Sequence, residues 1–455
     1  MLILAIFWPA LAGVLIFLLP AARSSRSLRA KLCCGALALE FVPVLALCGA
    51  RGLEVTLLQM TPTLSIFLKV DTVGCIFAVL MCAMWLLAAV FALEYLEHDA
   101  HEASFQAFYM TVLSALVGQC FAGSMVTLYV FYELMTLLSV PLVVHERTPQ
   151  AVAAGVKYLV YSIFGAMLGL MGIFFFNHYL GTVTFAPGGV APLSGVVTPG
   201  LLVVTFLVIL GFGTKAGVLA ILRVIYFLVG VKALAGTWVQ TAFMTLALIT
   251  VFMGSMLAYR EPLLKKRLAY STVSQVSYVL FGLSCMVPEA FEGALLHVLA
   301  HSTIKDALFL CAGAIIHQTG KTMVGDLRGI GKQMPVTIWC WTIASLGLIG
   351  IPPTGGFVSK WQLATGSLAS GMGALSVIGP VVLIVSALLT AAYLLPVTIY
   401  GFFPGSDFDY ASLEKKEPGW LMLVPMLLLA AGVVLTGVLA QPLISAFASV
   451  ASAVL

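Results

Sequence analysis

Charged residues are missing from long stretches of this chain. It has 22 Lys and Arg and 18 Asp and Glu among 455 residues, so 9% of the residues are charged and 62% are hydrophobic. Soluble domains carry roughly 25% charged residues. One spanning helix needs about 20 apolar residues, which leaves room for about 13 or 14 such helices and for almost no aqueous domain. The chain is therefore predicted to be an all-α polytopic membrane protein: a channel, a transporter or a membrane subunit.

Continuous apolar windows predict where these helices lie. Their number is fourteen, and no linker is long enough to separate independent domains, so residues 1–455 are expected to form one membrane domain. An uncharged loop rich in Gly and Pro is expected around 182–199. The windows are 2–20, 30–50, 70–95, 106–122, 124–145, 153–180, 200–230, 237–258, 268–287, 290–317, 335–351, 356–372, 374–403 and 419–448.

The cysteines and the first apolar run suggest no separate chemistry. The nine cysteines contain no C-x-x-C pair and nearly all lie in apolar runs, so we interpret them as small buried hydrophobic residues and expect no metal site. The run at residues 2–20 lacks a basic segment before it and a convincing cleavage site, so we expect it to remain as the first helix. The cysteines are Cys33, Cys34, Cys48, Cys75, Cys82, Cys120, Cys285, Cys311 and Cys340.

Basic loops predict the orientation, because cytoplasmic loops are rich in Lys and Arg. The loop after the first helix is predicted to be cytoplasmic, with the N-terminus outside, because it carries Arg23, Arg26, Arg29 and Lys31. Counting onward places the loop at 145–147 inside and the loop at 182–199 outside. The next basic cluster can be cytoplasmic only if an odd number of crossings separates residues 200 and 258, but the windows supply two. That cluster is Arg260, Lys265, Lys266 and Arg267.

Two ionisable residues of the first half stand inside apolar segments. Glu133 lies in LYVFYELMTLLSV, and Lys215 lies in LVILGFGTKAGVLAIL among three glycines. A buried ionisable group in a membrane is costly and is a functional candidate by default. Glycines beside the lysine predict a helix that breaks there and exposes backbone groups to a polar cavity. The alternatives are a structural carboxylate that pairs with a neighbouring helix and a close helix crossing through small residues.

A polar stripe is predicted on the helix at 290–317. His297, His301 and Lys305 follow one another at intervals of four residues. This spacing places them on one helix face over roughly 12 Å. Titratable groups in such a stripe are what a proton relay needs, because each hop then covers only a hydrogen bond or one bridging water. The alternative is that they are satisfied core residues.

A second break is predicted before Lys360, in IGIPPTGGFVSKW, where two prolines and two glycines must interrupt the helix. Paired Gly- or Pro-interrupted segments beside buried lysines indicate the central path of a transporter. Glu40 is solitary within its helix and is given no role. Asp71 begins a helix, where a cap is the simplest interpretation.

These residues lie in seven segments that resemble the antiporter-like proton-translocating subunits shared by respiratory complex I, membrane-bound energy-converting hydrogenases and Mrp-type cation/proton antiporters. The resemblance implies fourteen helices and two inverted five-helix repeats, each with a broken helix. It implies that Glu133 and Lys215 form an input-side pair, that Lys305 with His297 and His301 is the central relay, and that Lys360 is the exit-side lysine. The segments are FYELMTL, AGVKYLVYSIFGA, GFGTKAG, RLAYSTVSQVSYVLFGL, HVLAHSTIKDALFLCAGAIIH, DLRGIGKQMP and IGIPPTGGFVSKW.

The chain departs from this family after Lys215. Members continue with a segment resembling P-x-H-x-W-L-P-x-A-H and an eighth helix that holds another lysine, whereas here Lys215 leads directly into VLAILRVIYFLVG. About 35 residues, enough for one crossing and its loop, are thus expected to be missing. Lys215 can then match either lysine of the family.

We expect either an incomplete or altered sequence or a first half-channel that no longer conducts. The expected organisation has N-terminal helices at 1–122, an incomplete first repeat at 106–236, a second repeat at 237–403 and a C-terminal helix at 419–448.

The resemblance predicts a proton- or cation/proton-translocating subunit of a membrane redox complex in the cell membrane. It is expected to hold no cofactor and no catalytic centre of its own, and to bind other membrane subunits, peripheral redox subunits and lipid, but no nucleic acid. The alternative is a Mrp-type Na⁺/H⁺ exchanger without redox coupling. A haem- or quinone-carrying redox subunit that uses His297 and His301 is a weaker alternative, because two histidines one turn apart on one helix cannot both coordinate one haem axially and no matching pair is expected on another helix.

Overall fold

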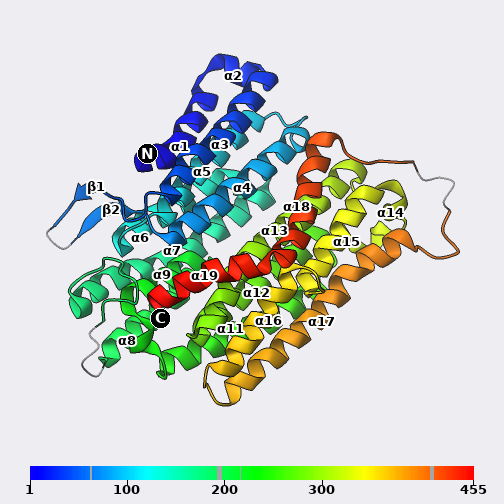
Figure 1. Cartoon of the computed structure of the whole chain (residues 1–455). Coiled ribbons are helices and arrows are strands. Elements are labelled where there is room, and N and C mark those ends of the chain that lie inside the picture. Colours follow the sequence, from blue (N-terminus) through cyan, green and yellow to red (C-terminus); the bar gives the residue numbers. More distant parts are fainter. Residues whose placement is uncertain (62–63, 192–196, 216, 410–413) are drawn as a thin grey trace. The chain divides into compact units, whose positions relative to one another are not determined.

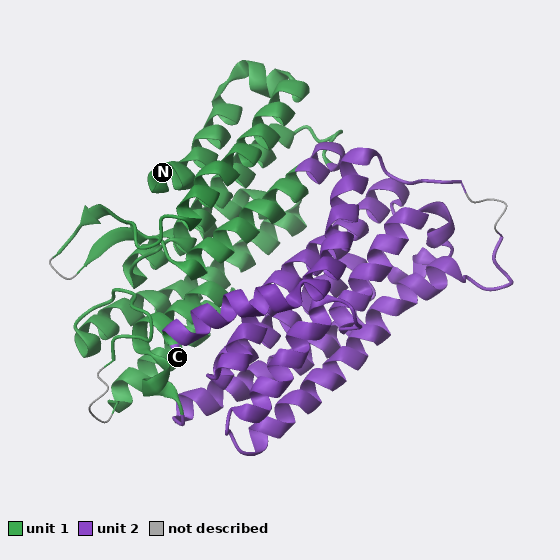
Figure 2. Cartoon of the chain, viewed as in Figure 1, with its two compact units in different colours: residues 1–89, 96–235, 454 green, residues 90–95, 236–453, 455 purple. Residues whose placement is uncertain are grey.

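The structure is a computed structural model that describes residues 1–61, 64–191, 197–215, 217–409 and 414–455. Helices make up most of it (Figure 1), so the predicted all-α membrane class is confirmed. The chain divides into two compact units (Figure 2): unit 1 holds residues 1–89, 96–235 and 454, and unit 2 holds residues 90–95, 236–453 and 455. The arrangement as two inverted five-helix repeats stays a prediction.

Unit 1 contains the N-terminal helices, a small sheet and the helix break that carries Lys215. Helix α4 (Thr72–Tyr95) begins in unit 1, and its residues 90–95 belong to unit 2. The other elements of unit 1 are α1 Leu2–Leu18, α2 Pro20–Ser24, α3 Arg26–Cys48, β1 Glu54–Gln59, β2 Ser65–Lys69, α5 Glu102–Cys120, α6 Met125–Val143, α7 Pro149–Leu180, α8 Pro199–Gly213, α9 Val218–Arg223, the π-helix η1 Val224–Val229 and α10 Val231–Leu234.

Unit 2 contains the helices of the second half. Its elements are α11 Trp238–Arg260, α12 Leu264–Cys285, α13 Pro288–Thr319, the 3-10 helix η2 Val324–Leu327, α14 Ile330–Gln333, α15 Pro335–Ile349, α16 Gly355–Ala369, α17 Ala374–Phe402, α18 Trp420–Val438 and α19 Ala440–Val454.

Many helices are long and apolar enough to cross a membrane. Eight of those in the described part of the chain have at least 18 residues and the composition of a span, and five further apolar helices are shorter. The eight are Arg26–Cys48, Thr72–Tyr95, Met125–Val143, Pro149–Leu180, Trp238–Arg260, Pro288–Thr319, Ala374–Phe402 and Trp420–Val438.

Capping hydroxyls, first-turn prolines and a terminal glycine mark the ends of the helices that carry the site. The hydroxyl of Ser124 accepts a hydrogen bond from the Thr127 N–H at the start of α6, and that of Thr148 accepts from Ala151 at the start of α7. Proline occupies the first turn of α7, α8, α13 and α15, where its missing N–H costs no helical bond. Helix α13 ends at Thr319, and the φ of 71° at the next residue, Gly320, is left-handed and suits glycine.

The small antiparallel sheet β1–β2 was not expected from the sequence. Its strands pair Glu54 with Lys69 at one end and Gln59 with Ser65 at the other. The segments EVTLLQ and SIFLK are rich in β-branched and large apolar residues, which favour a pleated surface. Each segment is too short for a spanning helix, so a search for spans could not find it.

Unit 1 has two ends, which we name after a residue at each. At the Arg26 end, Arg26 pairs with Glu97 and His145 pairs with Asp99, so the loops before α3, after α4 and after α6 lie together. At the Asp71 end, backbone bonds join residue 69 to 121, 123 to 67 and 125 to 183. The sheet and the loops after α5 and α7 therefore lie at the Asp71 end.

The segment at 199–235 folds as a re-entrant hairpin. Helix α8 starts from the loop at the Asp71 end and stops at Gly213, and α9 begins at Val218. Arg223, at the end of α9, already binds Asp71 and the carbonyl of Cys120 at that same end. The following π-helix η1 accepts backbone bonds at residues 226–229 from the loop after α7. The chain thus returns to the end of unit 1 from which α8 began.

This hairpin removes the conflict over the basic loops. The expectation that 200–230 is one crossing was wrong. Helix α8 runs away from the Asp71 end of unit 1, and α9 with η1 returns to that same end. Helix α11, with 23 residues, is then the single crossing between residues 200 and 258. One crossing is an odd number, as the positive-inside rule requires, and the side on which each loop lies stays a prediction.

At the break in unit 2, between α15 and α16, the chain continues in the same direction instead of turning back. Helices α15 and α16 run along α17: Thr342 of α15 contacts Thr398 at 3.0 Å, and Ser367 of α16 donates to the Ser376 carbonyl at 3.0 Å. These contacts lie near opposite ends of α17, so α15 and α16 form one interrupted helix.

The expected C-terminal helix at 419–448 is interrupted as well. Helix α18 ends at Val438, and α19 begins at Ala440. Near this point a Cβ on Gly437 would clash with the Pro353 carbonyl oxygen. The end of α18 therefore packs directly on the backbone of the break between α15 and α16.

Candidate functional site

In unit 1, Lys215 lies at the predicted helix break and faces one turn of α6. Its Nζ is 3.5 Å from Glu133 Oε1, donates to Thr136 Oγ1 and lies 4.3 Å from the ring centroid of Tyr132. The Lys215 side chain is 7% exposed and that of Glu133 is 23% exposed, so the pair is partly shielded from its surroundings. Both the carboxylate and the aromatic face attract a cation. The structure thus brings together the two residues that the sequence singled out in the first half.

The break is held against α7 by a close helix approach. A Cβ on Gly165 would clash with Thr214 Oγ1 and with the Gly211 carbonyl oxygen, so only glycine fits there without a shift. The Thr214 hydroxyl donates to the same carbonyl at 2.7 Å, which satisfies a backbone group near the end of α8. A broken helix and a close crossing of small residues, weighed as alternatives for this segment, are therefore both present.

A pocket of about 480 Å³ opens beside Lys215. Lys157 of α7 lines it, and so does Ser162, whose buried hydroxyl has no hydrogen-bond partner in the part of the chain that is described. The sequence reasoning missed both residues, although AGVKYLVYSIFGA displays them in an apolar segment. The full lining is Met135, Ala154, Lys157, Tyr158, Tyr161, Ser162, Thr214 and Lys215.

In unit 2, the predicted polar stripe of α13 is present. His297 and His301 stack with ring centroids 6.1 Å apart and an interplanar angle of 17°. The Lys305 Nζ, one turn further, donates to Ser271 Oγ at 2.6 Å and to the Leu268 carbonyl at 2.7 Å. His297 and Lys305 are almost fully buried. The Nε2 atoms of both histidines have no partner among the described residues.

Lys360 occupies the second break and approaches the same stripe. Its Nζ donates to the carbonyls of Leu348 and Ile349 at 2.5 and 3.0 Å, at the end of α15. It also lies 5.0 Å from the ring centroid of Tyr278, which in turn stacks on His297 at 5.4 Å. A cation is favoured at a helix C-terminus because the last carbonyls have no helical partner there. The order of this set is Lys305, His301, His297, Tyr278 and Lys360.

The sequence reasoning missed the residues that hold this set in place. Ser359 Oγ contacts His297 Nδ1 at 2.9 Å, and the Tyr278 hydroxyl donates to the Leu383 carbonyl at 2.9 Å. Ser271 and Tyr278 are seven residues apart on α12 and so share one face. That spacing was a readable signal, because polar side chains at helical intervals in an apolar helix need partners on a neighbouring one.

Asp71, Glu40 and the cysteines lie outside both clusters. Asp71 accepts from the Gly74 N–H at 2.7 Å, as a cap does, and it also pairs with Arg223. Glu40 is fully buried, and its carboxylate oxygens have no hydrogen-bond partner among the described residues. All nine cysteines have free thiols and seven are buried. No group of three or more His, Cys, Asp or Glu in the described ranges has the arrangement of a metal site.

Known proteins are similar in sequence to this chain. A transmembrane family described as NADH:quinone oxidoreductase/Mrp antiporter matches residues 122–222 and 202–386, and the two matches overlap at the segment that carries Lys215. The chain is 30% identical over 427 residues to NADH-quinone oxidoreductase subunit N of Desulforudis audaxviator, with 84% of each chain covered. It is 28% identical over 420 residues to a Na⁺/H⁺ antiporter subunit of Alkalihalophilus pseudofirmus, with 86% of this chain and 84% of that protein covered.

A solved structure shares the fold. It is a chain of the membrane-bound sulfane sulfur reductase, an archaeal respiratory membrane complex, and superposes with a TM-score of 0.85 at 21% identity. The match covers 100% of this chain and 99% of that chain. The chain therefore has the fold of a membrane-complex subunit along its whole length.

Proposed function

Because this chain belongs to the NADH:quinone oxidoreductase/Mrp antiporter transmembrane family, we propose that it translocates protons, or exchanges cations for protons, as a subunit of a membrane redox complex. One observation carries the proposal: unit 2 holds a row of buried titratable side chains from Lys305 to Lys360 beside an interrupted helix. Ionisable groups are expensive in a membrane and mark ion or proton pathways.

The proposed path in unit 2 moves protons in short steps. The stacked imidazoles of His301 and His297 can each take a proton on one nitrogen and release it from the other. Lys305 lies one turn beyond His301, and Lys360 approaches His297 through the ring of Tyr278. Water would bridge the groups that are not in direct contact. Lys360 is the proposed exit-side residue.

Charge coupling links successive steps of the path. A proton that arrives at one site raises the cost of charging its neighbour, and this effect is large where water is excluded. Glu133 and Lys215 in unit 1 are the proposed input-side pair, because an ion pair at 3.5 Å can loosen or tighten as a nearby charge changes. Partner chains of the complex would supply the redox energy that drives the cycle.

The proposal includes a shortened first half. Two family matches overlap at 202–222, which is what a chain gives when one of its segments corresponds to two places in the family. The hairpin at 199–235 supports the same view, since it holds a single lysine near its tip where the resemblance implies two. We therefore assign the main path to unit 2, with the Glu133–Lys215 pair of unit 1 on its input side and no complete second path in unit 1.

The proposed location is the cell membrane, with the N-terminus outside. The basic residues of the Arg26 end then lie in the cytoplasm, and the loop at 182–199 lies outside. The hairpin supports this orientation, because with α11 as the one crossing after it the second basic loop, at 260–267, would also be cytoplasmic. Labelling by a membrane-impermeant thiol reagent tests it, with Ser24→Cys and Thr198→Cys each introduced into a variant that lacks the native cysteines. Labelling from outside is expected at residue 198 alone, and the opposite pattern would reverse the orientation.

Replacement of the relay lysines tests the function. Lys305→Ala and Lys360→Ala, each in the assembled complex, are expected to reduce redox-driven proton uptake by vesicles at least about tenfold, because each removes one link of the set. Lys416→Ala is the matched control, since its side chain is exposed in a loop. Undiminished uptake in both relay variants would overturn the proposal. Lys215→Ala measures how much unit 1 still conducts.

Exchange of Na⁺ for protons without redox coupling is the second candidate, and the 28% identity to a Na⁺/H⁺ antiporter component favours it. The same lysines serve both functions, so their replacement does not separate the two. Vesicles in which a Na⁺ gradient alone drives proton movement, with no electron donor present, would support the exchanger. Proton uptake that requires an electron donor supports the redox-driven pump.

A further inference from the structure

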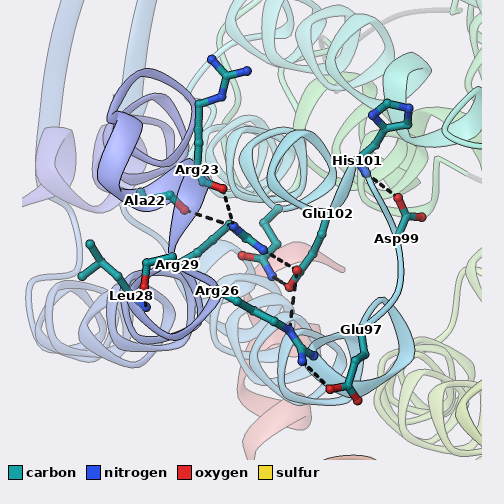
Figure 3. Close-up of polar contacts among 11 residues, drawn as sticks. Ala22, Arg23, Arg26, Leu28, Arg29, Glu97, Asp99, His101 and Glu102 are labelled. Carbon is teal, nitrogen blue, oxygen red and sulfur yellow. Dashed lines mark hydrogen bonds and ion pairs between the residues drawn. The ribbon is translucent and has the colours of Figure 1, made fainter.

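The turn between α1 and α3 is a rigid elbow built around Arg29 (Figure 3). The Arg29 guanidinium donates to the carbonyls of Ala22 and Arg23, each at 3.1 Å, and it pairs with Glu102 of α5. Arg29 and Glu102 are 6% and 3% exposed, so this ion pair is buried. Helix α2, which forms the elbow, is therefore tied to both α3 and α5.

Three arginines stand at this elbow, and acidic residues neutralise two of them. Arg26 lies 2.7 Å from Glu97 and 3.7 Å from Glu102, and Arg29 pairs with Glu102. Arg23 is exposed and has no acidic partner within the described residues. Figure 3 shows its guanidinium pointing away from the carboxylates. The elbow thus presents one cation that no carboxylate of the described chain balances.

An apolar groove of about 290 Å³ ends beside that cation. The α1 residues of the groove include Phe17, and the Arg23 guanidinium lies 5.8 Å from the Phe17 ring centroid. The groove floor is a close approach of α1 to α5, where a Cβ on Gly13 would lie 2.6 Å from the Ala107 carbonyl oxygen. The groove is lined by Gly13, Val14, Phe17, Leu18, Ala107, Phe108 and Thr111.

We propose that this groove binds one anionic phospholipid, with an acyl chain between α1 and α5 and its phosphate on Arg23. A phospholipid carries an anion and an apolar chain at opposite ends of one short linkage, which matches the cation and the groove at the elbow. Basic sites beside transmembrane helices select anionic headgroups. The single polar lining residue, Thr111, does not oppose an acyl chain, because its hydroxyl donates to the Phe108 carbonyl at 2.9 Å.

A helix of a partner subunit fits the same groove less well. It would cover the apolar lining but would bring no anion to Arg23, and the cation would then lie at the edge of a dry contact without a counter-charge. The lipid satisfies both features at once. This inference does not depend on the proposed proton path, because the groove and the elbow contain none of its residues.

The experiment uses the full chain in nanodiscs that contain a trace of a phospholipid with a photoreactive group on one acyl chain. The probe is a phosphatidylglycerol in one sample and a phosphatidylcholine in the other, and mass spectrometry maps the crosslinks. We expect the phosphatidylglycerol probe to label residues 13–18 and 107–111 several times more than the phosphatidylcholine probe. Arg23→Gln is expected to reduce this preference about fivefold, the effect of one basic residue near a membrane surface.

Three comparisons keep the proposal falsifiable. Lys31→Gln removes another exposed basic residue of the same region, so an equal loss in this variant would mean diffuse attraction and overturn the site. Val14→Phe fills the groove and is expected to reduce labelling by both probes, while Arg23→Gln, an exposed substitution, leaves the fold intact. Equal labelling by the two probes would also contradict the proposal. So would a photoreactive residue placed at position 14 that crosslinks to a partner subunit in the assembled complex.

Discussion

Arg223 binds both carboxylate oxygens of Asp71, although the two residues are 152 positions apart in the chain. The same guanidinium donates to the Cys120 carbonyl at 3.1 Å and lies 4.7 Å from the Phe227 ring centroid. The Arg223 side chain is fully buried, whereas that of Asp71 is 24% exposed. This contact ties the returning limb of the hairpin to the start of α4.

The unequal burial of this pair predicts unequal effects of replacing its members. Asp71→Asn leaves a buried cation without its counter-charge and is expected to lower the free energy of unfolding by about 3–5 kcal/mol. Arg223→Met leaves only a partly exposed carboxylate. Its effect on the free energy of unfolding is expected to be smaller than that of Asp71→Asn by about 1–2 kcal/mol. Denaturant unfolding of the purified chain, followed by intrinsic fluorescence, measures both. Asp326→Asn, at an exposed position of the 3-10 helix η2, is the control; equal costs for the two variants would refute this interpretation.

Gly165 and Gly35 provide a matched pair of helical glycines. A Cβ at Gly165 would meet Thr214 and the Gly211 carbonyl at the break, whereas nothing lies within 4 Å of the corresponding position at Gly35. Gly165→Ala is therefore expected to destabilise by about 1–3 kcal/mol through overpacking. Gly35→Ala is expected to stabilise slightly, by about 0.5–1 kcal/mol, because alanine favours a helix. The thermal midpoints of the two variants in detergent give the comparison, and a neutral Gly165→Ala would argue against a tight crossing at this site.

Ser359 is expected to tune the proposed relay through His297. Ser359→Ala removes the contact of 2.9 Å to Nδ1 and frees the imidazole to turn away from Tyr278 and His301. Loss of one hydrogen bond of about 1 kcal/mol predicts roughly a fivefold fall in the rate of proton uptake by vesicles. Ser302→Ala is the control, because its hydroxyl donates to the Val298 carbonyl of its own helix. Equal rates in both variants would exclude this role for Ser359.

The loop pair Asp99–His145 predicts a dependence of stability on pH. Burial opposes ionisation of Asp99, but hydrogen bonds from the His101 N–H and the His145 ring outweigh it and lower the pKa of this carboxyl below its ordinary value of 3.8. A lowered folded-state pKa stabilises the protein above pH 3.8, and this stabilisation is lost as the pH falls through the folded-state pKa. Asp99→Asn should therefore cost about 1 kcal/mol or less near neutral pH, and this cost should shrink in acid. A constant difference between the thermal midpoints of variant and parent from neutral pH to about pH 3 would contradict this assignment.

Periodicity and charge placement were sufficient for much of this fold. The polar stripe of α13 follows from three residues at intervals of four, and both helix breaks follow from Gly or Pro beside a lysine. These patterns could not predict whether the chain turns back or continues after a break. The segments at 199–230 and 335–372 look alike as interrupted apolar runs, but one turns back and one continues. The difference depends on long-range contacts, chiefly Arg223 with Asp71 in the first and the packing of α15 and α16 along α17 in the second.

The hydrogen-bond partners of the site residues could not be predicted from the sequence for a similar reason. Thr136, Ser271 and Ser359 are small polar residues, and such residues bond to their own helix as readily as to another. Only packing decides which of them faces a lysine or a histidine. Glu133 and Lys215, in contrast, stood out in the sequence because each is the single charge in a long apolar run, and the family resemblance implied that they pair.

The hairpin at 199–235 also bears on how such a chain can change during evolution. A segment that enters and leaves on the same side keeps the parity of the crossings, whatever its length. Residues can be lost from it, or added to it, and every later loop still reaches its own compartment. Length changes within the hairpin thus leave the orientation of the second half unchanged, so a lineage can shorten this segment without inverting the helices that follow it.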